Sequence, residues 1–426
     1  MQRRDFLKGA GALGAGVWLG VAPGTGRAAS ANDKLNLAVV GLGGRGGDNL
    51  KGVGQENIVA LCDVDDVRAG KAYETYPHAK KFFDFRQMFD AVEKQIDGVV
   101  ISTPDHTHFH PAWWAIERGK HVYLEKPLAH SMWEIRKLTD AAAAKKLATQ
   151  LGAQRHTLPG LRQVVEFVRA GTIGAVKEVH SWIGSSRGMP KPLDDAPQTP
   201  PASLKWDLWL GPVKERPYHK EVVPYNWRFW WDFGTGEAGN WGCHILDIPY
   251  WALDLKYPTH VEGAGPAPDA ARTPTAMATK FQFPAEGKRP AVTLHWYQGT
   301  PPILNELKVD GRGMNNLFIG TEGMLACSWD KHRLLPADKF ADVKPPAQTL
   351  PPTPGFYKEW FNAIRGGEPA SCNWAYAGPM AETVLLANIA YRIEGGFTWD
   401  AAALKATDNP AVEKYLRSEF RKGWEV

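Results

Sequence analysis

A glycine-rich turn directly behind an apolar segment is the feature that most constrains the fold of this chain. Residues 35–40 (LNLAVV) are typical of a buried strand, and residues 41–46 (GLGGRG) precede a segment compatible with a helix. The glycines of a G-x-G-x-x-G turn permit a tight turn, close approach of the backbone to a pyrophosphate, and close packing of helix on strand. The helix N-terminus would hold the phosphates. The turn therefore predicts a dinucleotide site that includes Gly41, Gly43, Gly44, Arg45 and Gly46.

An acid at the end of the next apolar segment extends this prediction to the ribose. Residues 58–62 (IVALC) indicate a second strand, and Asp63 follows it, 22 residues after Gly41. This is close to the spacing of the acid that binds an adenosine ribose and repels a 2′-phosphate. We therefore expect NAD as the cofactor, with NADP less favoured. Asp65 is a competing candidate, and either acid could instead cap a helix.

Polar residues also follow two further apolar segments. Residues 97–102 and 122–124 indicate strands, and they lead into TPDH at 103–106 and EKP at 125–127. Open α/β sheets bind their ligands at the carboxyl ends of the strands. We therefore expect the cofactor to be bordered by Thr103, Pro104, Glu125 and Lys126.

Three histidines alternate along the segment that opens the next helix: His106, His108 and His110. A helix start would separate their rings, and no acid or cysteine cluster accompanies them, so we expect no metal here. We favour contacts of His106 or His108 with the cofactor loop or the substrate. Helix capping stays open as an alternative.

The N-terminus is typical of a targeting signal. Residues 3–8 (RRDFLK) form a twin-arginine pattern, a weakly apolar segment follows, and a small-residue cleavage site lies at 29–31. We expect a signal peptide over residues 1–31 that delivers the protein to the twin-arginine export machinery, with a periplasmic or otherwise exported location. Because this route moves folded proteins, we also expect a tightly bound cofactor.

Charge and composition exclude several classes of function. The 50 basic and 46 acidic residues fall to 46 and 45 without residues 1–31, so nothing points to nucleic acid or an anionic membrane surface. No apolar run is long enough to span a membrane. The four cysteines lack metal-type spacing, and buried free thiols are favoured over disulfides.

The length of 426 residues favours two domains. We expect an α/β Rossmann nucleotide-binding domain over residues 34–153. An α+β domain with a large open, mainly antiparallel sheet would follow over residues 154–426, and its C-terminal helices could pack back on the first domain. Strands are predicted at 176–183, 276–283, 291–297, 304–310, 316–320 and 324–329. Helices are predicted at 161–169, 356–365, 379–392 and 408–424.

The quoted motifs, namely residues 41–46, Asp63, 103–106, 119–122 and 125–127, together resemble the Gfo/Idh/MocA family of glucose-fructose oxidoreductase, inositol dehydrogenase and rhizopine catabolism proteins. The resemblance implies that Lys126 lies beside the nicotinamide and the substrate hydroxyl. It also implies a helix that carries an acid, a histidine four residues later and a second acid three beyond, and an open sheet that pairs in a homodimer or homotetramer.

In this sequence those three helix positions hold Asn240, His244 and Asp247. The spacing i, i+4, i+7 predicts that they share one helical face. An amide cannot titrate, so with Asn240 in place of the acid the proton transfer must rest on His244 and Lys126. Aromatic residues crowd into 206–233, where they are suited both to sugar stacking and to a core. Expected substrate contacts are Lys126, Arg155, Tyr225, Trp227, Arg228, Trp241 and His244.

The preferred interpretation is an exported NAD(P)-dependent oxidoreductase that acts on a hydroxyl or keto carbon of a small carbohydrate, such as a sugar, glycoside or polyol. His244 would take the hydroxyl proton and Lys126 would stabilise the alkoxide. Asn240 and Asp247 would fix the substrate and orient His244. One alternative is an NAD-dependent glycoside hydrolase or lyase that works by transient oxidation, elimination and re-reduction. A second is a non-catalytic sugar-binding protein.

Overall fold

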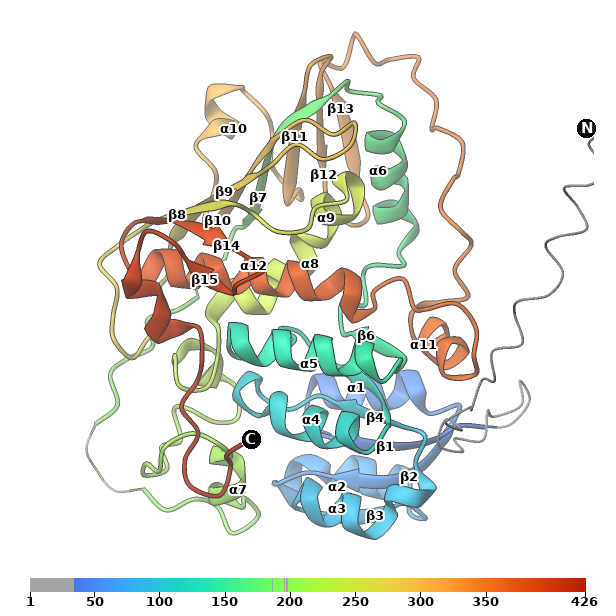
Figure 1. Cartoon of the computed structure of the whole chain (residues 1–426), viewed down its shortest axis with the longest axis vertical. Coiled ribbons are helices and arrows are strands. Elements are labelled where there is room, and N and C mark those ends of the chain that lie inside the picture. The colour runs from blue at the N-terminus through green and yellow to red at the C-terminus, as the bar shows by residue number, and fades with distance from the viewer. Residues whose placement is uncertain (1–33, 186, 195, 197) are drawn as a thin grey trace, which may run out of the picture.

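A computed structural model describes residues 34–185, 187–194, 196 and 198–426 of the chain, which form two sheets with their helices (Figure 1). The expected signal peptide, residues 1–31, lies outside these described residues. Within them, no helix combines the length and apolar character needed to cross a membrane.

The first sheet is fully parallel, with the strand order β3-β2-β1-β4-β5-β6. Its central strands are continuous runs of buried Val, Ile, Leu and Ala, as expected where helices cover both faces. The strand order reverses between β1 and β4, which is where open α/β sheets form their ligand crevice. The strands are β1 (Asn36–Val40), β2 (Asn57–Cys62), β3 (Lys80–Phe82), β4 (Gly98–Ile101), β5 (His121–Leu124) and β6 (Thr149–Leu151).

Five helices accompany this sheet, and local capping explains where several begin. Asp65 accepts hydrogen bonds from two amides of α2, and Ser131 forms a capping box with Glu134 at the start of α5. The strand β3 and the helices α2 and α3 were not predicted. The helices are α1 (Arg45–Val53), α2 (Asp66–Thr75), α3 (Phe85–Val92), α4 (Phe109–Glu117) and α5 (Met132–Ala144).

The second sheet has nine strands in the order β13-β12-β11-β7-β10-β9-β8-β14-β15. Its paired strands run antiparallel except for β7 and β10, which run parallel, so the predicted large and mainly antiparallel sheet is confirmed. The strands are β7 (Val176–Ile183), β8 (His260–Ala264), β9 (Met277–Phe283), β10 (Val292–Gln298), β11 (Asn316–Gly320), β12 (Met324–Cys327), β13 (His332–Leu335), β14 (Gly396–Asp400) and β15 (Lys405–Ala406).

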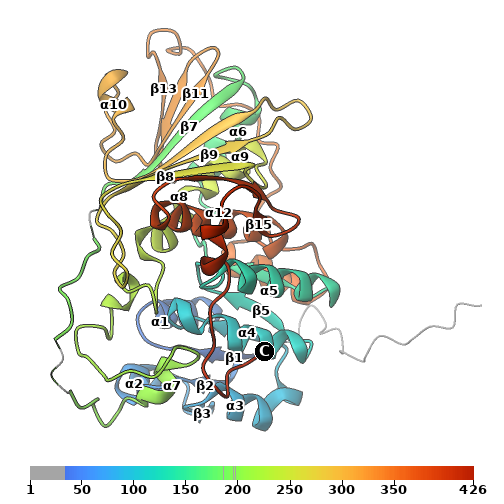
Figure 2. The same cartoon turned by 60° about the vertical axis from the view of Figure 1, so that its left-hand side comes forward.

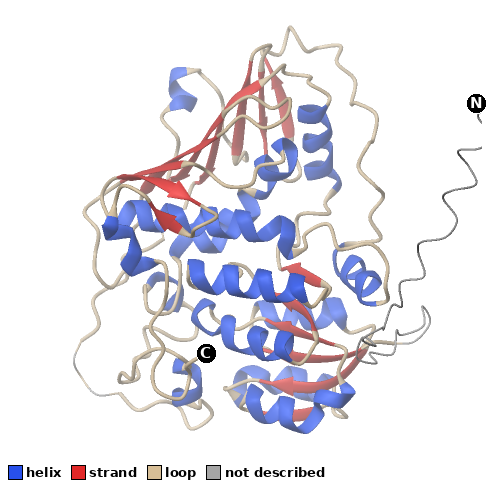
Figure 3. Cartoon of the chain, in the orientation of Figure 1, coloured by secondary structure: helices blue, strands red, loops and turns tan. Residues whose placement is uncertain are grey.

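One face of the second sheet is covered by α6 (Pro159–Arg169), α9 (Asp247–Leu253) and α12 (Trp374–Arg392). Figures 2 and 3 show α12 lying between this sheet and α5 of the first half. Arg136 of α5 donates two hydrogen bonds to the buried carboxylate of Glu382 on α12, at 2.9 and 2.8 Å. On α11 (Phe356–Ile364), Trp360 packs against Tyr123 of β5. The domain boundary at residue 153 stays a prediction.

Two predicted elements are wrong. Residues 304–310 do not form a strand, because the pair Pro301-Pro302 starts the short helix α10 (Ile303–Glu306), which buries Leu304 against the sheet. Residues 408–424 form only the short 3-10 helix η5 (Pro410–Tyr415). Beyond it the chain runs back to the first half, where Trp424 packs against Phe85, so tertiary contacts override the helical spacing of its apolar residues. All four cysteines are buried free thiols, as expected.

Candidate active site

A cleft of about 620 Å³ opens at the carboxyl ends of the parallel strands. Its first wall comes from β1, β2, β4 and β5, and its second from residues 201–244. That segment docks on the first half through backbone hydrogen bonds, among them Asp66 N to Ser203 O at 3.2 Å and Lys205 N to Val64 O at 2.8 Å. The cleft therefore lies between the first sheet and this segment, with polar groups from both.

The glycine-rich turn forms the floor of the cleft at the start of α1. Gly41 and Gly44 adopt positive φ angles of 85° and 55°, which favour glycine. A Cβ on Gly46 would lie 2.1 Å from the Gly41 carbonyl oxygen, so helix and strand meet too closely for a side chain. Gly41, Gly43, Gly44 and Arg45 line the cleft, whereas Gly46 packs beneath it. No side chain of the described residues caps this helix start, so its amides fit a pyrophosphate.

Asp63 holds the end of β2 against the glycine turn. Its carboxylate accepts hydrogen bonds from Leu42 N at 2.7 Å and from Asp65 N at 3.0 Å. Burial raises the pKa of this carboxyl group. Asp65, the competing candidate, caps α2 through Val67 N. The two acids thus have different positions, and Asp63 is the one beside the turn.

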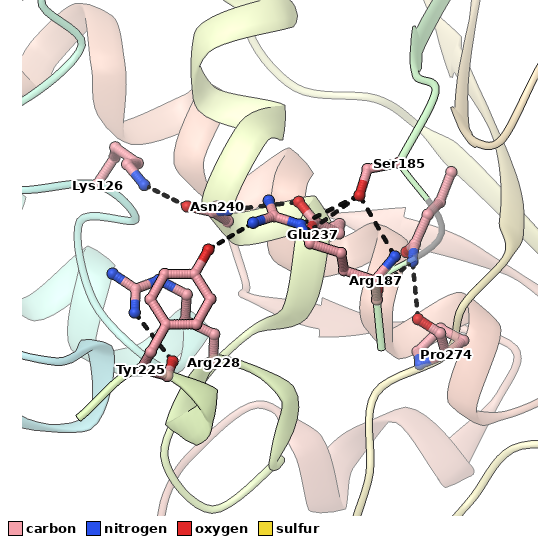
Figure 4. A network of polar contacts seen from close by, with 9 residues as sticks. Lys126, Ser185, Arg187, Tyr225, Arg228, Glu237, Asn240 and Pro274 are labelled. Carbon is pink, nitrogen blue, oxygen red and sulfur yellow. Dashed lines mark hydrogen bonds and ion pairs between the residues drawn. The ribbon is translucent and has the colours of Figure 1, made fainter. Parts of the chain in front are cut away.

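Lys126 lies at the end of β5, partly exposed to the cleft. Its Nζ donates a hydrogen bond to Asn240 Oδ1 at 2.8 Å (Figure 4). Burial lowers the pKa of the ammonium group, while the neighbouring Glu125 opposes that shift. Glu125 is buried and accepts hydrogen bonds from Asn49 at 3.0 Å and from Gln154 at 2.5 Å. A lysine that is easier to deprotonate than usual therefore faces the cleft.

Asn240 connects Lys126 to a buried acid that sequence reasoning missed. Its Nδ2 donates to Glu237 Oε2 at 3.3 Å, and Glu237 is only 1% exposed. Glu237 forms an ion pair with Arg187, whose guanidinium also donates to the Tyr225 hydroxyl (Figure 4). A continuous polar chain thus links the lysine to the far wall of the cleft. The only sequence signal was a single acid inside the glycine-rich stretch GTGEAGN at 234–240.

His244 faces the same cleft from α8 (Cys243–Ile245). Burial lowers the pKa of its ring well below the usual value, and the charges of Lys126 and Arg155 add to the effect, so the ring is neutral near pH 7. Its Nδ1 has no hydrogen-bond partner within the described residues. Trp241 packs edge-on against this ring at 5.9 Å and stacks on Trp329. A neutral imidazole with a free nitrogen can accept a proton.

Asp247 does not share the cleft with Asn240 and His244. The segment η4 (Ala238–Gly242) is a π turn, in which each residue rotates less about the axis than in an α-helix. The expected i, i+7 alignment is therefore lost, and Asp247 accepts hydrogen bonds from His156 at 2.9 Å and from the Tyr376 hydroxyl at 2.6 Å. The structure gives Asp247 a place in the core, where it cannot orient His244.

His106 and His108 lie beneath the loops of the cleft and outside its lining. The ring of His106 contacts the carbonyl oxygens of Trp209 at 2.9 Å and Phe233 at 3.2 Å. The ring of His108 contacts those of Pro127 at 2.7 Å and Thr103 at 2.8 Å. Both rings therefore hold backbone segments in place, while Thr103 and Pro104 themselves line the cleft.

The remaining expected substrate contacts form the outer wall. The guanidinium of Arg228 lies 4.4 Å from the ring centre of Tyr225 and 4.3 Å from that of Trp227, and Arg155 lies 5.2 Å from the ring centre of Trp241. All five residues line the cleft. Most of the other aromatic residues of 206–233 build a separate small core, and two of them, Trp209 and Tyr218, also border the cleft.

A parallel sheet with strand order 3-2-1-4-5-6, a glycine-rich turn at its switch point and a second sheet behind the cleft define a two-domain dinucleotide-binding oxidoreductase fold. The chain belongs to the Gfo/Idh/MocA oxidoreductase family. Residues 35–153 match the family model for its NAD-binding Rossmann fold, and residues 180–284 match the model for its C-terminal alpha/beta domain. Residues 1–20 match the model of a twin-arginine signal sequence. The fold class and the family resemblance are thereby confirmed.

Individual relatives resemble parts of the chain. The rhizopine catabolism protein MocA of Rhizobium meliloti is 30% identical over 142 residues, which are 33% of this chain and 44% of that protein. A glycosyl hydrolase family 109 protein of Solibacter usitatus is 32% identical over 199 residues, 40% and 43% of the two chains. The chain thus spans less than half the length of these curated relatives.

Among solved structures, the WlbA dehydrogenase of Bordetella pertussis, in complex with NADH and UDP-GlcNAcA, superimposes with a TM-score of 0.62. The match covers 86% of this chain and 99% of that one at 15% identity. At this identity the likeness shows the fold.

Proposed function

We propose that this protein is an exported oxidoreductase that uses tightly bound NAD to oxidise a hydroxyl, or reduce a keto carbon, of a sugar, glycoside or polyol in the periplasm. The observation that carries the proposal is that Lys126 and the neutral ring of His244 both line the cleft that the glycine-rich turn borders, where the charge of Lys126 helps to lower the pKa of His244. The twin-arginine signal match supports export.

The chain's own groups would hold the cofactor in a defined register. The uncapped start of α1 receives the pyrophosphate, and Asp63 receives the adenosine ribose hydroxyls. Thr103 and Pro104 border the path toward Lys126. Bound there, the nicotinamide supplies a hydride acceptor or donor beside the substrate carbon.

His244 takes up the proton of the substrate hydroxyl, and Lys126 stabilises the negative charge that develops on the substrate oxygen. A neutral His244 accepts the hydroxyl proton as the carbon loses its hydride. The Lys126 ammonium stabilises the alkoxide oxygen, and its lowered pKa makes it able to pass a proton on. Asn240 fixes the direction of the ammonium group at 2.8 Å. The aromatic and arginine side chains of the outer wall would stack against the carbohydrate ring.

A redox-neutral glycoside hydrolase or lyase is the second candidate, favoured by the 32% identity to a glycosyl hydrolase family 109 protein. Oxidation of a ring hydroxyl to a ketone acidifies the neighbouring C–H bond. Loss of that proton expels the β-positioned leaving group and forms an alkene. In a hydrolase water then adds to the alkene, whereas in a lyase the alkene remains. Return of the hydride to the ketone ends the cycle. The same Lys126 and His244 would serve both reactions.

The cofactor test begins with the purified protein, which is denatured and analysed for released NAD and NADP. Stoichiometric NAD supports the proposal. If denaturation releases no NAD or NADP and the purified protein binds no added NAD, both catalytic functions are contradicted. The third candidate, a non-catalytic sugar-binding protein, would then remain.

The reaction test uses 4-nitrophenyl glycosides and a panel of free sugars and polyols, read at the absorbance of bound NADH. Stoichiometric NADH formation supports net oxidation. Release of nitrophenol at a constant NADH level supports the hydrolase or lyase instead. Sugar binding without either signal would favour the non-catalytic candidate.

We also propose that the protein is a homodimer or homotetramer that pairs through the outer face of its nine-stranded sheet. The family resemblance supports this pairing. Light scattering of the exported protein tests it, because a monomer at micromolar concentration would contradict it.

A further inference from the structure

Two histidines and a glutamate meet on the outer face of the nine-stranded sheet. His180 on β7 and His295 on β10 are direct partners in the parallel ladder. Glu178 precedes His180 by two residues, so both side chains point to the same face of β7. The three side chains thus converge on one point between two central strands.

The distances within this cluster resemble those of a metal site. Both His180 Nε2 and His295 Nε2 lie 3.0 Å from Glu178 Oε1, and the three ligand atoms lie within 4.8 Å of one another. Ligand atoms around a tetrahedral zinc ion are about 3.3 Å apart, given bonds of about 2.0–2.2 Å. An ion among these atoms would need only small side-chain adjustments.

A buried ring nitrogen without a hydrogen-bond partner among the described residues points into the space between these three side chains. His180 is only 3% exposed, and its Nε2 makes no hydrogen bond of acceptable geometry within the described residues, although Glu178 is near. On the other side of the ring, Nδ1 contacts the Tyr297 hydroxyl at 3.2 Å. A second contact of this kind is what orients metal-binding histidines and sets their tautomer.

This cluster is separate from the candidate active site. The neighbouring Ser181 points to the opposite face, where it donates to Asn316, and Asn316 in turn donates to the Ile245 carbonyl of α8. Alternation along β7 therefore places His180 on the face away from His244.

We propose that Glu178, His180 and His295 bind a divalent transition-metal ion, with zinc the best match, and leave one coordination position for water. Two imidazoles and one carboxylate form a ligand set that suits Zn²⁺. The ion would join β7 to β10 at the centre of the sheet and neutralise the carboxylate. Its role is structural, because it lies away from the cleft.

The test uses the mature protein with an affinity tag that contains no histidine, stripped of metal by a chelator. Zinc is titrated against a chromophoric competitor, and cobalt is added separately to record the visible bands of a tetrahedral site. We expect a single ion per chain, cobalt bands of tetrahedral type, and a thermal midpoint that zinc raises. His295→Gln and Glu178→Gln should each lower zinc affinity at least about tenfold and abolish the thermal shift.

His260→Gln is the matched control, because His260 lies on the same sheet face with its Nε2 3.1 Å from Glu262 Oε1. This variant should bind zinc as the unmodified protein does. Equal losses in the His260 and His295 variants would show unspecific surface binding and overturn the proposal. So would wild-type affinity no higher than that of His295→Gln. None of these outcomes depends on the proposed catalytic activity.

Discussion

The ammonium of Lys126 points at the amide oxygen of Asn240, 2.8 Å away, and receives no carboxylate partner from that helix. An amide orients the ammonium without a full negative charge, so it does little to oppose the fall in pKa that burial causes. The position where the family resemblance implies an acid thus holds a neutral group, and the nearest acid of this segment, Glu237, is one hydrogen bond further away.

Lys126→Met should lower kcat/KM by about 10²–10⁴-fold, because the methionine keeps most of the length of the side chain but cannot stabilise an alkoxide or pass a proton. Steady-state kinetics with the best substrate of the panel measure this loss. The amount of NAD released on denaturation should stay that of the unmodified protein. Full turnover in this variant would contradict the proposed role of Lys126.

Glu237→Gln should impair catalysis without preventing substrate binding. The carboxylate holds the Asn240 amide in the orientation that presents its oxygen to Lys126, and a glutamine can be satisfied with that amide in either orientation. We expect kcat to fall by about 10-fold with a smaller change in KM. The pH dependence of kcat should also change, since Lys126 loses a fixed partner. If the substitution only disturbed the structure, the pH dependence of kcat would stay the same as in the unmodified protein.

The strands and motifs around the cofactor cleft were predictable because they are local. Runs of apolar residues followed by glycine or acid mark strand ends, and residues 41–46 and 125–127 fall where the structure places the cleft. The position of Asp247 was not predictable. The π-helical segment η4 changes which residues share one face of the helix, and no residue pattern in the sequence indicates such a segment. Glu237 and Arg187 are 50 residues apart and meet only through the fold.

The same reason explains the missed cluster on the sheet. His180 and His295 belong to strands that are far apart in sequence and become neighbours through a parallel pairing. Metal-type spacing is a local signal that only residues close in sequence can show. In this sequence it pointed to the neighbouring histidines His106 and His108, whose rings contact backbone carbonyl oxygens in the structure. The fold class was therefore accessible from sequence, whereas contacts between distant segments were not.

Asp63→Asn should shift cofactor preference toward NADP. The asparagine oxygen can still accept the hydrogen bond from Leu42 N, at the loss of the bond from Asp65 N, and the substitution removes the charge that repels a 2′-phosphate. Arg68 lines the same end of the cleft and its guanidinium would then attract that phosphate. We expect the ratio of NADP affinity to NAD affinity, measured by titration of the cofactor-stripped protein, to rise by about tenfold or more. Adding Arg68→Ala should reverse most of the change, and an unchanged ratio in Asp63→Asn would contradict the assignment.

Gly46→Ala should destabilise the first half of the protein. A Cβ at this position lies 2.1 Å from the Gly41 carbonyl oxygen, and backbone cannot move aside cheaply. We expect a loss of about 1–3 kcal/mol in the free energy of unfolding, with weaker NAD retention. The control is Gly70→Ala in α2, where the new Cβ meets no described atom within 4 Å apart from its chain neighbours and the adjacent backbone of its own helix. That variant should gain up to about 1 kcal/mol, and urea denaturation compares the two.

His110→Gln should reduce the acid sensitivity of the fold. Burial lowers the pKa of His110 to about 4, while the same ring in the unfolded chain has a pKa of about 6.5. Between these values the unfolded state binds a proton that the native state does not. Stability therefore falls as pH falls, by about 1.4 kcal/mol per pH unit for this residue.

Glutamine can still donate to the Trp424 carbonyl oxygen that His110 Nε2 contacts at 2.8 Å. The variant should thus be similar to the unmodified protein at pH 7.5 and lose less stability down to pH 5. Urea denaturation at both values measures the difference in slope. Identical slopes would mean that His110 is protonated in the native state or is exposed to solvent, and would exclude burial as the cause of its low pKa.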